Sequence, residues 1–293
     1  MSDIPFDERV RFKHVLQDGL VALAVDTVLF GLFAGAYAAL LWSLITHLKS
    51  GPRHHVPAKI SSAVVLFLMF VIAFAYLGVD AATAVFGFVD NSGDLDLMAL
   101  GLTDTAVGHW DLEGMFLFMQ IALASFFMVY RLFEVWGRNI WVAVLPALLS
   151  LATFGAGVSM LAKLFHYSTN YPADVRTTLF YALSSATTGL CAVLIIGRLI
   201  TRKSRLASSL VLPRAAAVIA DIFIRSAVVY VAATIGLAVY MASDLSRPRP
   251  KWIIGGMPSF IGVTFSTIVL WELKMLKTEP EDEDTEKLNV QTA

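Results

Sequence analysis

Long apolar stretches separated by short polar connections dominate the chain. Seven of them reach the roughly 20 residues that a helix needs to cross a hydrocarbon core about 30 Å thick. The second stretch stays apolar as far as Phe88. Backbone groups in lipid must bond within their own segment, and no alternating ten-residue segments appear, so the pattern predicts helices. The stretches lie near residues 19–46, 60–80, 113–136, 139–163, 178–200, 215–242 and 252–273.

This pattern predicts an all-α polytopic membrane protein with seven transmembrane helices in one bundle. The membrane domain spans residues 19–273, after an N-terminal extracellular or lumenal segment at 1–18. Residues 274–293 form an acidic cytoplasmic tail, which is predicted to be disordered because like charges repel each other. The tryptophans support these limits, since Trp prefers the headgroup level. All six fall at or near predicted span ends: Trp42, Trp110, Trp136, Trp141, Trp252 and Trp271.

Composition agrees with a membrane protein. Of the 293 residues, 57% are hydrophobic and 15% are charged, whereas soluble domains have about 45–50% apolar and 25% charged residues. These values argue against a disordered chain, a nucleic-acid-binding protein and a soluble enzyme. The lipid bilayer is therefore the first expected partner. The single cysteine, Cys191, excludes an intramolecular disulfide.

The distribution of basic residues predicts the orientation. The connections after the first, third and fifth stretches, together with the C-terminal tail, carry 13 Lys and Arg residues, and the opposite side carries 8. The positive-inside rule places the richer side in the cytoplasm. We therefore expect the N-terminus outside and the C-terminus inside, in the plasma membrane rather than an endomembrane.

The connection near 89–112 contains five aspartates and no Lys or Arg. Its spacing does not match a calcium-binding loop, which has ligands at alternate positions, a Gly and a closing Glu. We interpret it as a solvated outer loop.

Five ionisable residues inside the apolar stretches are candidate switch or ion-pair residues, because charges in lipid are costly and often functional. Asp221 and Arg225 are four residues apart and can neutralise each other on one helix face. Alternatively, Arg131 lies at a depth that allows a cross-helix lock with Asp221, and Arg225 would then need another partner, for which Asp26 is at a compatible depth. The full set is Asp26, Arg131, Glu134, Asp221 and Arg225.

The fifth stretch carries a polar stripe at positions i, i+3, i+4 and i+7, which should face the bundle interior. The stripe either lines a ligand pocket or joins helices through hydroxyl hydrogen bonds. In the last stretch, Gly255, Gly256 and Pro258 form a candidate hinge, since proline removes a backbone bond and kinks a helix. Pro146 has the same effect in the fourth stretch. The stripe consists of Tyr181, Ser184, Ser185 and Thr188.

No catalytic, cofactor or metal site is predicted. All six histidines lie at or outside span ends, and none forms a His-x-x-x-His pair within a span. A buried metal hydrolase would need such ligands. The last stretch has no lysine before Lys274, so no Schiff-base site for retinal is visible either.

Four segments resemble, in order, a family of uncharacterised seven-helix membrane proteins from mushroom-forming fungi. The resemblance covers residues from about 115 to the last stretch, and more weakly the first two. It implies a receptor-like topology. The segments are 130–139 (YRLFEVWGRN) followed by Trp141 and Pro146, 194–198 (LIIGR), 225–230 (RSAVVY), and 256–258 (GMP) with Ile261.

The chain departs from this family pattern at three positions. Ser125 stands where the family usually has Asp, and Thr188 stands where it has Asn. Arg225 replaces a Glu, which reverses a charge, so any ion pair of that Glu must be rearranged here.

These features predict a receptor-like sensor of an unknown ligand, with a small ligand and a cytoplasmic signalling partner as possible binding partners and no role for nucleic acid. A small transporter or channel is the alternative, although no repeat is visible and seven spans do not divide equally. A lipid-organising structural protein is a third reading.

Overall fold

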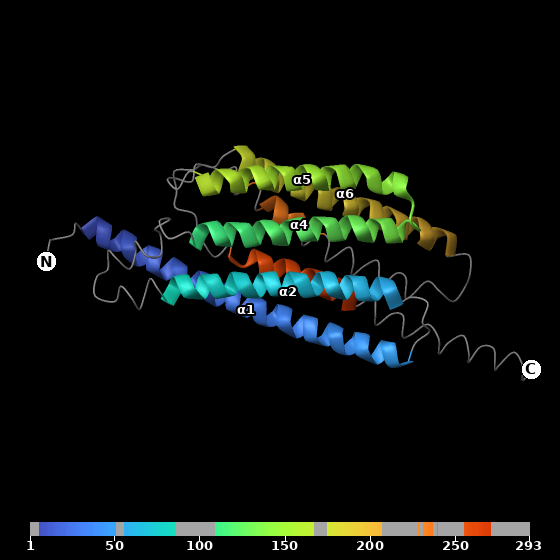
Figure 1. Cartoon of the computed structure of the whole chain (residues 1–293), viewed down its shortest axis with the longest axis horizontal. Coiled ribbons are helices and arrows are strands. Elements are labelled where there is room, and N and C mark those ends of the chain that lie inside the picture. The colour runs from blue at the N-terminus through green and yellow to red at the C-terminus, as the bar shows by residue number, and fades with distance from the viewer. Residues whose placement is uncertain are drawn as a thin grey trace, which may run out of the picture.

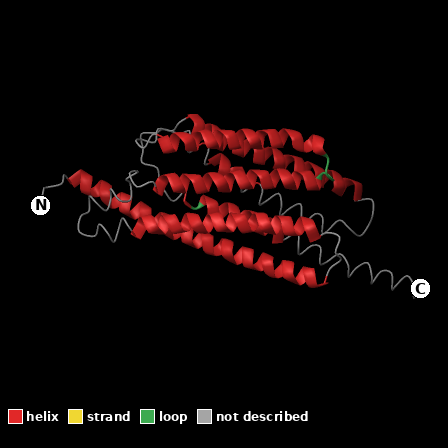
Figure 2. Cartoon of the chain, viewed as in Figure 1, coloured by secondary structure: helices red, strands yellow, loops and turns green. Residues whose placement is uncertain are grey.

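The computed structural model describes residues 6–50, 56–85, 109–166, 175–206, 228, 231–236, 239 and 255–270. Every secondary-structure element in these ranges is helical (Figure 1, Figure 2). The five long helices are α1 (Phe6–Ser50), α2 (Val56–Val85), α4 (His109–Val135), α5 (Ile140–His166) and α6 (Val175–Leu206).

Five helices are long and apolar enough to cross a membrane, and a shorter apolar helix, Met257–Leu270, follows (helix 257–270). The prediction of an all-helical protein with span-length apolar helices is confirmed for these ranges. The described residues do not establish the count of seven, because the sixth predicted stretch falls largely outside them. The candidate spans are Gln17–Thr46, Ser61–Val85, Leu112–Val135, Ile140–Ala162 and Arg176–Arg198.

Helix α4 is the centre of the bundle. It packs against α2, α5 and α6, while α1 packs on α2 and α5 on α6. Its span has the largest buried share of the five, and that of α1 the smallest. Figure 1 shows α4 between α5 and α2, with the red helix 257–270 behind them and α1 at the edge.

Pairs of contacting side chains fix the relative directions of the helices. Gln120 of α4 bonds to Pro258. Phe127 lies seven residues after Gln120, and it packs on Phe265, which lies seven residues after Pro258. The difference in residue number is 138 in both pairs, so α4 and helix 257–270 run parallel in a constant register. By the same reasoning, Asp26 with Ser259 and Phe33 with Gly262 make α1 parallel to helix 257–270.

Two further pairs complete the picture. The Phe118–Phe180 contact and the bond from Trp136 to Leu194 make α6 parallel to α4. Because α2 and α5 run in the opposite direction (Figure 1), the bundle has two ends. We call the end at which α4 begins the N-side, and the end at which α4 finishes the Arg131 side.

Polarity is distributed as expected in lipid rather than in water. Large apolar side chains point outward, including Leu32, Phe74 and Leu148, which are about 60% exposed. The interior instead contains many hydroxyl groups, such as those of Thr153 and Thr187, each bonded to a carbonyl one turn earlier. Outward apolar surface with inward polar groups suits a bundle surrounded by hydrocarbon.

A tight turn joins α4 to α5. The amide of Arg138 donates to the carbonyl of Phe133 at 2.9 Å, and that of Gly137 donates to Glu134 at 3.0 Å. This bond pair is a Schellman motif, which requires a left-handed residue at Gly137, where φ is +64°. Asn139 then caps α5, because its side-chain oxygen accepts the amide of Trp141 at 3.1 Å.

Two glycines allow aromatic rings to lie against helix backbones. A Cβ on Gly157 of α5 would collide with the ring of Phe118, and a Cβ on Gly262 would collide with the ring of Phe33. Each glycine therefore brings two helices close together, as small residues do in membrane bundles.

Candidate functional site

Three helices meet at a buried polar contact on the N-side. The hydroxyl of Ser259 donates to Oδ1 of Asp26 at 3.0 Å, and Nε2 of Gln120 donates to the carbonyl of Pro258 at 3.1 Å. Asp26, Gln120 and Ser259 are all fully buried. The contacts join α1 and α4 through consecutive residues of helix 257–270.

The depth of this contact makes it unusual. At 1.5 Å per residue, Asp26 lies about 14 Å along the span that begins at Gln17, and Gln120 about 12 Å along the span that begins at Leu112. An ionisable group at such depth in lipid is costly, and it is a functional-site hypothesis by default.

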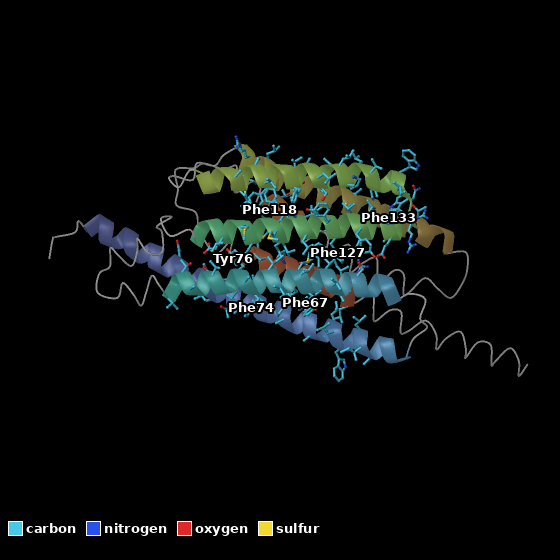
Figure 3. The ribbon with its side chains drawn as sticks, in the orientation of Figure 1. Phe67, Phe74, Tyr76, Phe118, Phe127 and Phe133 are labelled. Carbon is cyan, nitrogen blue, oxygen red and sulfur yellow. The ribbon has the colours of Figure 1, made fainter. Side chains whose placement is uncertain are left out.

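Further acidic and phenolic groups surround the contact. The buried hydroxyl of Tyr76 interacts electrostatically with Glu113, Asp80 and Asp26, and with the phenol of Tyr181. Figure 3 shows Tyr76 between α2 and α4. We call this group the acidic junction, and its members are Asp26, Tyr76, Asp80, Glu113, Gln120, Tyr181 and Ser259.

The backbone beside the junction is interrupted. Gly255 is helical, Gly256 adopts a turn, and regular helix resumes at Met257. Gly255 lies close to Tyr76, since a Cβ placed on it would be 3.9 Å from the Tyr76 hydroxyl. Pro258 occupies the first turn of helix 257–270, where no intrahelical donor is needed. The candidate hinge therefore lies at the junction, and its hinge role stays a prediction.

The predicted polar stripe of α6 is buried along its whole length. Ser185 and Thr188 bond to carbonyls of their own helix, those of Tyr181 and Ser184, at 2.8 and 2.9 Å. Tyr181 belongs to the acidic junction, whereas Oγ of Ser184 is buried and has no hydrogen-bond partner within the described ranges. The ligand-lining role of the stripe stays a prediction.

Arg131 and Glu134 lie at the other end of the bundle. The guanidinium of Arg131 lies over the ring of Phe127, 5.2 Å from its centroid, and Arg131 is buried. Glu134 accepts the hydroxyl of Tyr130 at 2.8 Å. Asp221 and Arg225 lie outside the described residues, so both arrangements expected for them stay predictions.

The two ends are connected through helix 257–270. Its first turn bonds to Asp26 and Gln120, and its Phe265 packs edge-on against Phe127, 5.4 Å between ring centroids. Phe127 in turn lies under the guanidinium of Arg131. A continuous chain of contacts therefore leads from the acidic junction to Arg131.

Segment 130–139 and the end of α6 are joined by side-chain contacts. The indole of Trp136 donates to the carbonyl of Leu194 at 3.3 Å, and the guanidinium of Arg198 lies 5.1 Å from the centroid of its ring. Gly137 and Asn139 form the turn into α5. These contacts fix α4, α5 and α6 together on the Arg131 side.

Sequence reasoning identified Asp26 and Tyr181 and missed the other members of the junction. Of these missed residues, only Gln120 could have been found from the sequence, because a carboxamide in the middle of an apolar stretch needs a polar partner. Asp80 and Glu113 lie at the limits of the predicted stretches, where charged residues are common. Ser259 follows Pro258 directly, and only the proline stood out in the sequence.

No group of three or more His, Cys, Asp or Glu side chains in the described part of the chain is arranged to hold a metal ion. Comparison with family models finds no match. No curated protein and no solved structure matches either.

Proposed function

We propose that this integral membrane protein is a seven-helix, receptor-like sensor of a small ligand, with its N-terminus outside and its C-terminus in the cytoplasm. The connection between the acidic junction and Arg131 through helix 257–270 is the observation that carries the proposal.

The direction of the helices supports a count of seven. Helix α6 runs from the N-side to the Arg131 side, and helix 257–270 begins again on the N-side. The chain between them therefore has to lead back to the N-side, within residues 207–254. Residues 231–236 are helical, and Val231 lies beside Gly189 of α6. A returning helix within the predicted stretch 215–242 accounts for both observations.

The orientation is supported by the charges. With an odd number of spans the termini lie on opposite sides, and the C-terminal side is richer in Lys and Arg. The acidic junction would then lie toward the outside and Arg131 toward the cytoplasm, where a signalling partner would bind.

Sensing requires that binding at one end changes the other end. A ligand that displaces Gly256 or Ser259 would move the first turn of helix 257–270. Because Phe265 of that helix packs on Phe127, the movement would reach the ring beneath Arg131. Such small helix shifts are a common way to transmit a change across a membrane bundle.

We also propose membership of the fungal seven-helix family. The resemblance is supported by the position of its strongest segment, 130–139, which contains the end of α4 and the whole turn into α5.

A transporter is the second candidate, because Asp26 lies about 14 Å along its span, beside the turn at Gly256 that precedes helix 257–270. Interrupted helices with buried polar groups form the ion sites of many transporters.

Topology is the first test. Tags at each terminus are probed with protease on sealed, right-side-out cells. We expect an accessible N-terminal tag and a protected C-terminal tag. Accessibility of both tags would contradict the odd number of spans.

Coupling is the second test. A fluorophore on Asn139→Cys, in a Cys191→Ala background, reports the Arg131 side while small molecules from a panel are added outside. A sensor gives a fluorescence change that Phe265→Ala abolishes. A flux into proteoliposomes that is lost in Asp26→Asn, with no fluorescence change, would favour the transporter.

A further inference from the structure

Among Asp26, Gln120 and Ser259, two buried oxygen atoms accept no hydrogen bond from any described residue. They are Oδ2 of Asp26 and Oε1 of Gln120. Both side chains are fully buried. Unpaired polar atoms inside a bundle are costly, so a pair of them at one place calls for an explanation.

The two side chains are held by consecutive residues of helix 257–270. Gln120 is held by the carbonyl of Pro258, and Asp26 is held by the hydroxyl of the next residue, Ser259. Because Nε2 of Gln120 donates to Pro258, its other amide atom is an acceptor by necessity. Asp26 as a carboxylate is also an acceptor only. The oxygens therefore cannot satisfy each other.

We propose that Asp26, Gln120 and Ser259 bind one small monovalent cation of the sodium type. Carboxylate, amide and hydroxyl oxygens are the ligands that hard cations prefer. The inference goes beyond the proposed function, since it requires only the described bundle and holds for a sensor or a transporter.

The charge of the ligands and the space between them indicate the valence and the size of the cation. Asp26 is the one carboxylate among the three proposed ligands, and no group of three His, Cys, Asp or Glu side chains among the described residues is arranged to hold a metal ion, which argues against a divalent ion. All three side chains are fully buried, so a close-packed interior admits only a small ion.

The approach from the N-side favours cations. Glu113 lies one residue from the start of the α4 span, and Asp80 lies five residues from the end of the α2 span. The connection between these helix ends, 86–108, carries four aspartates and no Lys or Arg. The aspartates are Asp90, Asp94, Asp96 and Asp104. Negative groups raise the local concentration of cations.

The chain contains its own reporter of unfolding. Cys191 is the one cysteine and is fully buried, so a maleimide dye reacts with it only after the bundle opens. We propose to measure the temperature of half-maximal labelling for the purified full-length protein, in NaCl and in equimolar KCl or choline chloride. A ligand that binds the folded state raises this temperature. We expect a rise of about 2–3 °C in NaCl at ten times the dissociation constant.

Three variants test the assignment. Asp26→Asn keeps the acceptor for Ser259 but removes the charge, and we expect it to lose the sodium response. Gln120→Met removes one ligand and should weaken the response at least tenfold in sodium concentration. Asp18→Asn, the same change at an exposed position of α1, is the matched control and should keep it. Equilibrium binding of radioactive sodium to the wild type tests the site without any variant and should saturate at one ion per chain.

Several results would overturn the proposal. One is the absence of saturable sodium binding to the wild type. Another is a sodium response that survives in Asp26→Asn. A transition that depends on pH but not on sodium would assign Oδ2 of Asp26 to a proton. A sodium response that appears only in Arg225→Gln would assign it to an ion pair with Arg225.

Discussion

At the glycine contacts of this bundle, the absence of a Cβ atom allows an aromatic ring to lie against the helix backbone. The rings of Phe118 and Phe180 pack on each other with 5.7 Å between centroids, and Phe118 also occupies the space beside Gly157. Since both rings are buried, neither can turn away into lipid.

Gly157→Ala is therefore expected to destabilise the bundle by about 1–3 kcal/mol, because an added methyl group in a full interior forces neighbours to move. Gly155→Ala is the control, since a Cβ there meets nothing within 4 Å. The temperature of half-maximal Cys191 labelling measures both variants. Equal labelling temperatures for the two variants would show that the ring of Phe118 moves aside without loss of stability.

At this scale the sequence predicted only part of the candidate site. Asp26 was identified because a carboxylate in an apolar stretch is conspicuous in any context. Gln120 and Ser259 matter because of their contacts with Pro258 and Asp26, and those contacts join positions more than 130 residues apart. No local pattern contains that information.

Among the elements, the turn from α4 to α5 is the most closely specified. Gly137 and Arg138 both have φ of +64°, a conformation that costs a residue with a side chain about 1–2 kcal/mol. Gly137 meets this need, whereas Arg138 bears the strain.

Gly137→Ala should destabilise the protein by about 1 kcal/mol, because alanine is strained at this position. Arg138→Gly should cause no loss, because it relieves the same strain one residue later. Chemical unfolding followed by Cys191 labelling compares the two. A larger loss in Arg138→Gly than in Gly137→Ala would contradict this account.

Helix positions were predicted well, and helix limits less well. The prediction of 60–80 for the second stretch is five residues short of the described span, which ends at Val85. Hydropathy marks the thickness of lipid, whereas a helix continues as long as its hydrogen bonds allow, as α1 does from Phe6 to Ser50. Gly137 lies within segment 130–139, whose sequence pattern does not specify the left-handed backbone of this turn.

For the whole molecule, the direction of each helix determines which residues meet at each end. The acidic junction collects residues from α1, α2, α4, α6 and helix 257–270, which are distant in sequence. The sequence map predicted a bundle of apolar, span-length helices, yet it could not order the helices around α4.

Side-specific labelling tests this arrangement. In a Cys191→Ala background, Asn139→Cys is exposed at the Arg131 side and should react with a membrane-impermeant maleimide only after cells are permeabilised. The wild-type Cys191 should not react under either condition. Labelling of Asn139→Cys in intact cells would reverse the proposed orientation.

The constant register between α4 and helix 257–270 has a mechanical consequence. Two contacts seven residues apart, at Gln120 and at Phe127, hold one rigid rod against another along two turns. Slippage by one turn, about 5.4 Å, would have to break both at once. Helix 257–270 is therefore restricted to small tilts and shifts taken as a unit, so a displacement at its first turn is delivered nearly undiminished eight residues away.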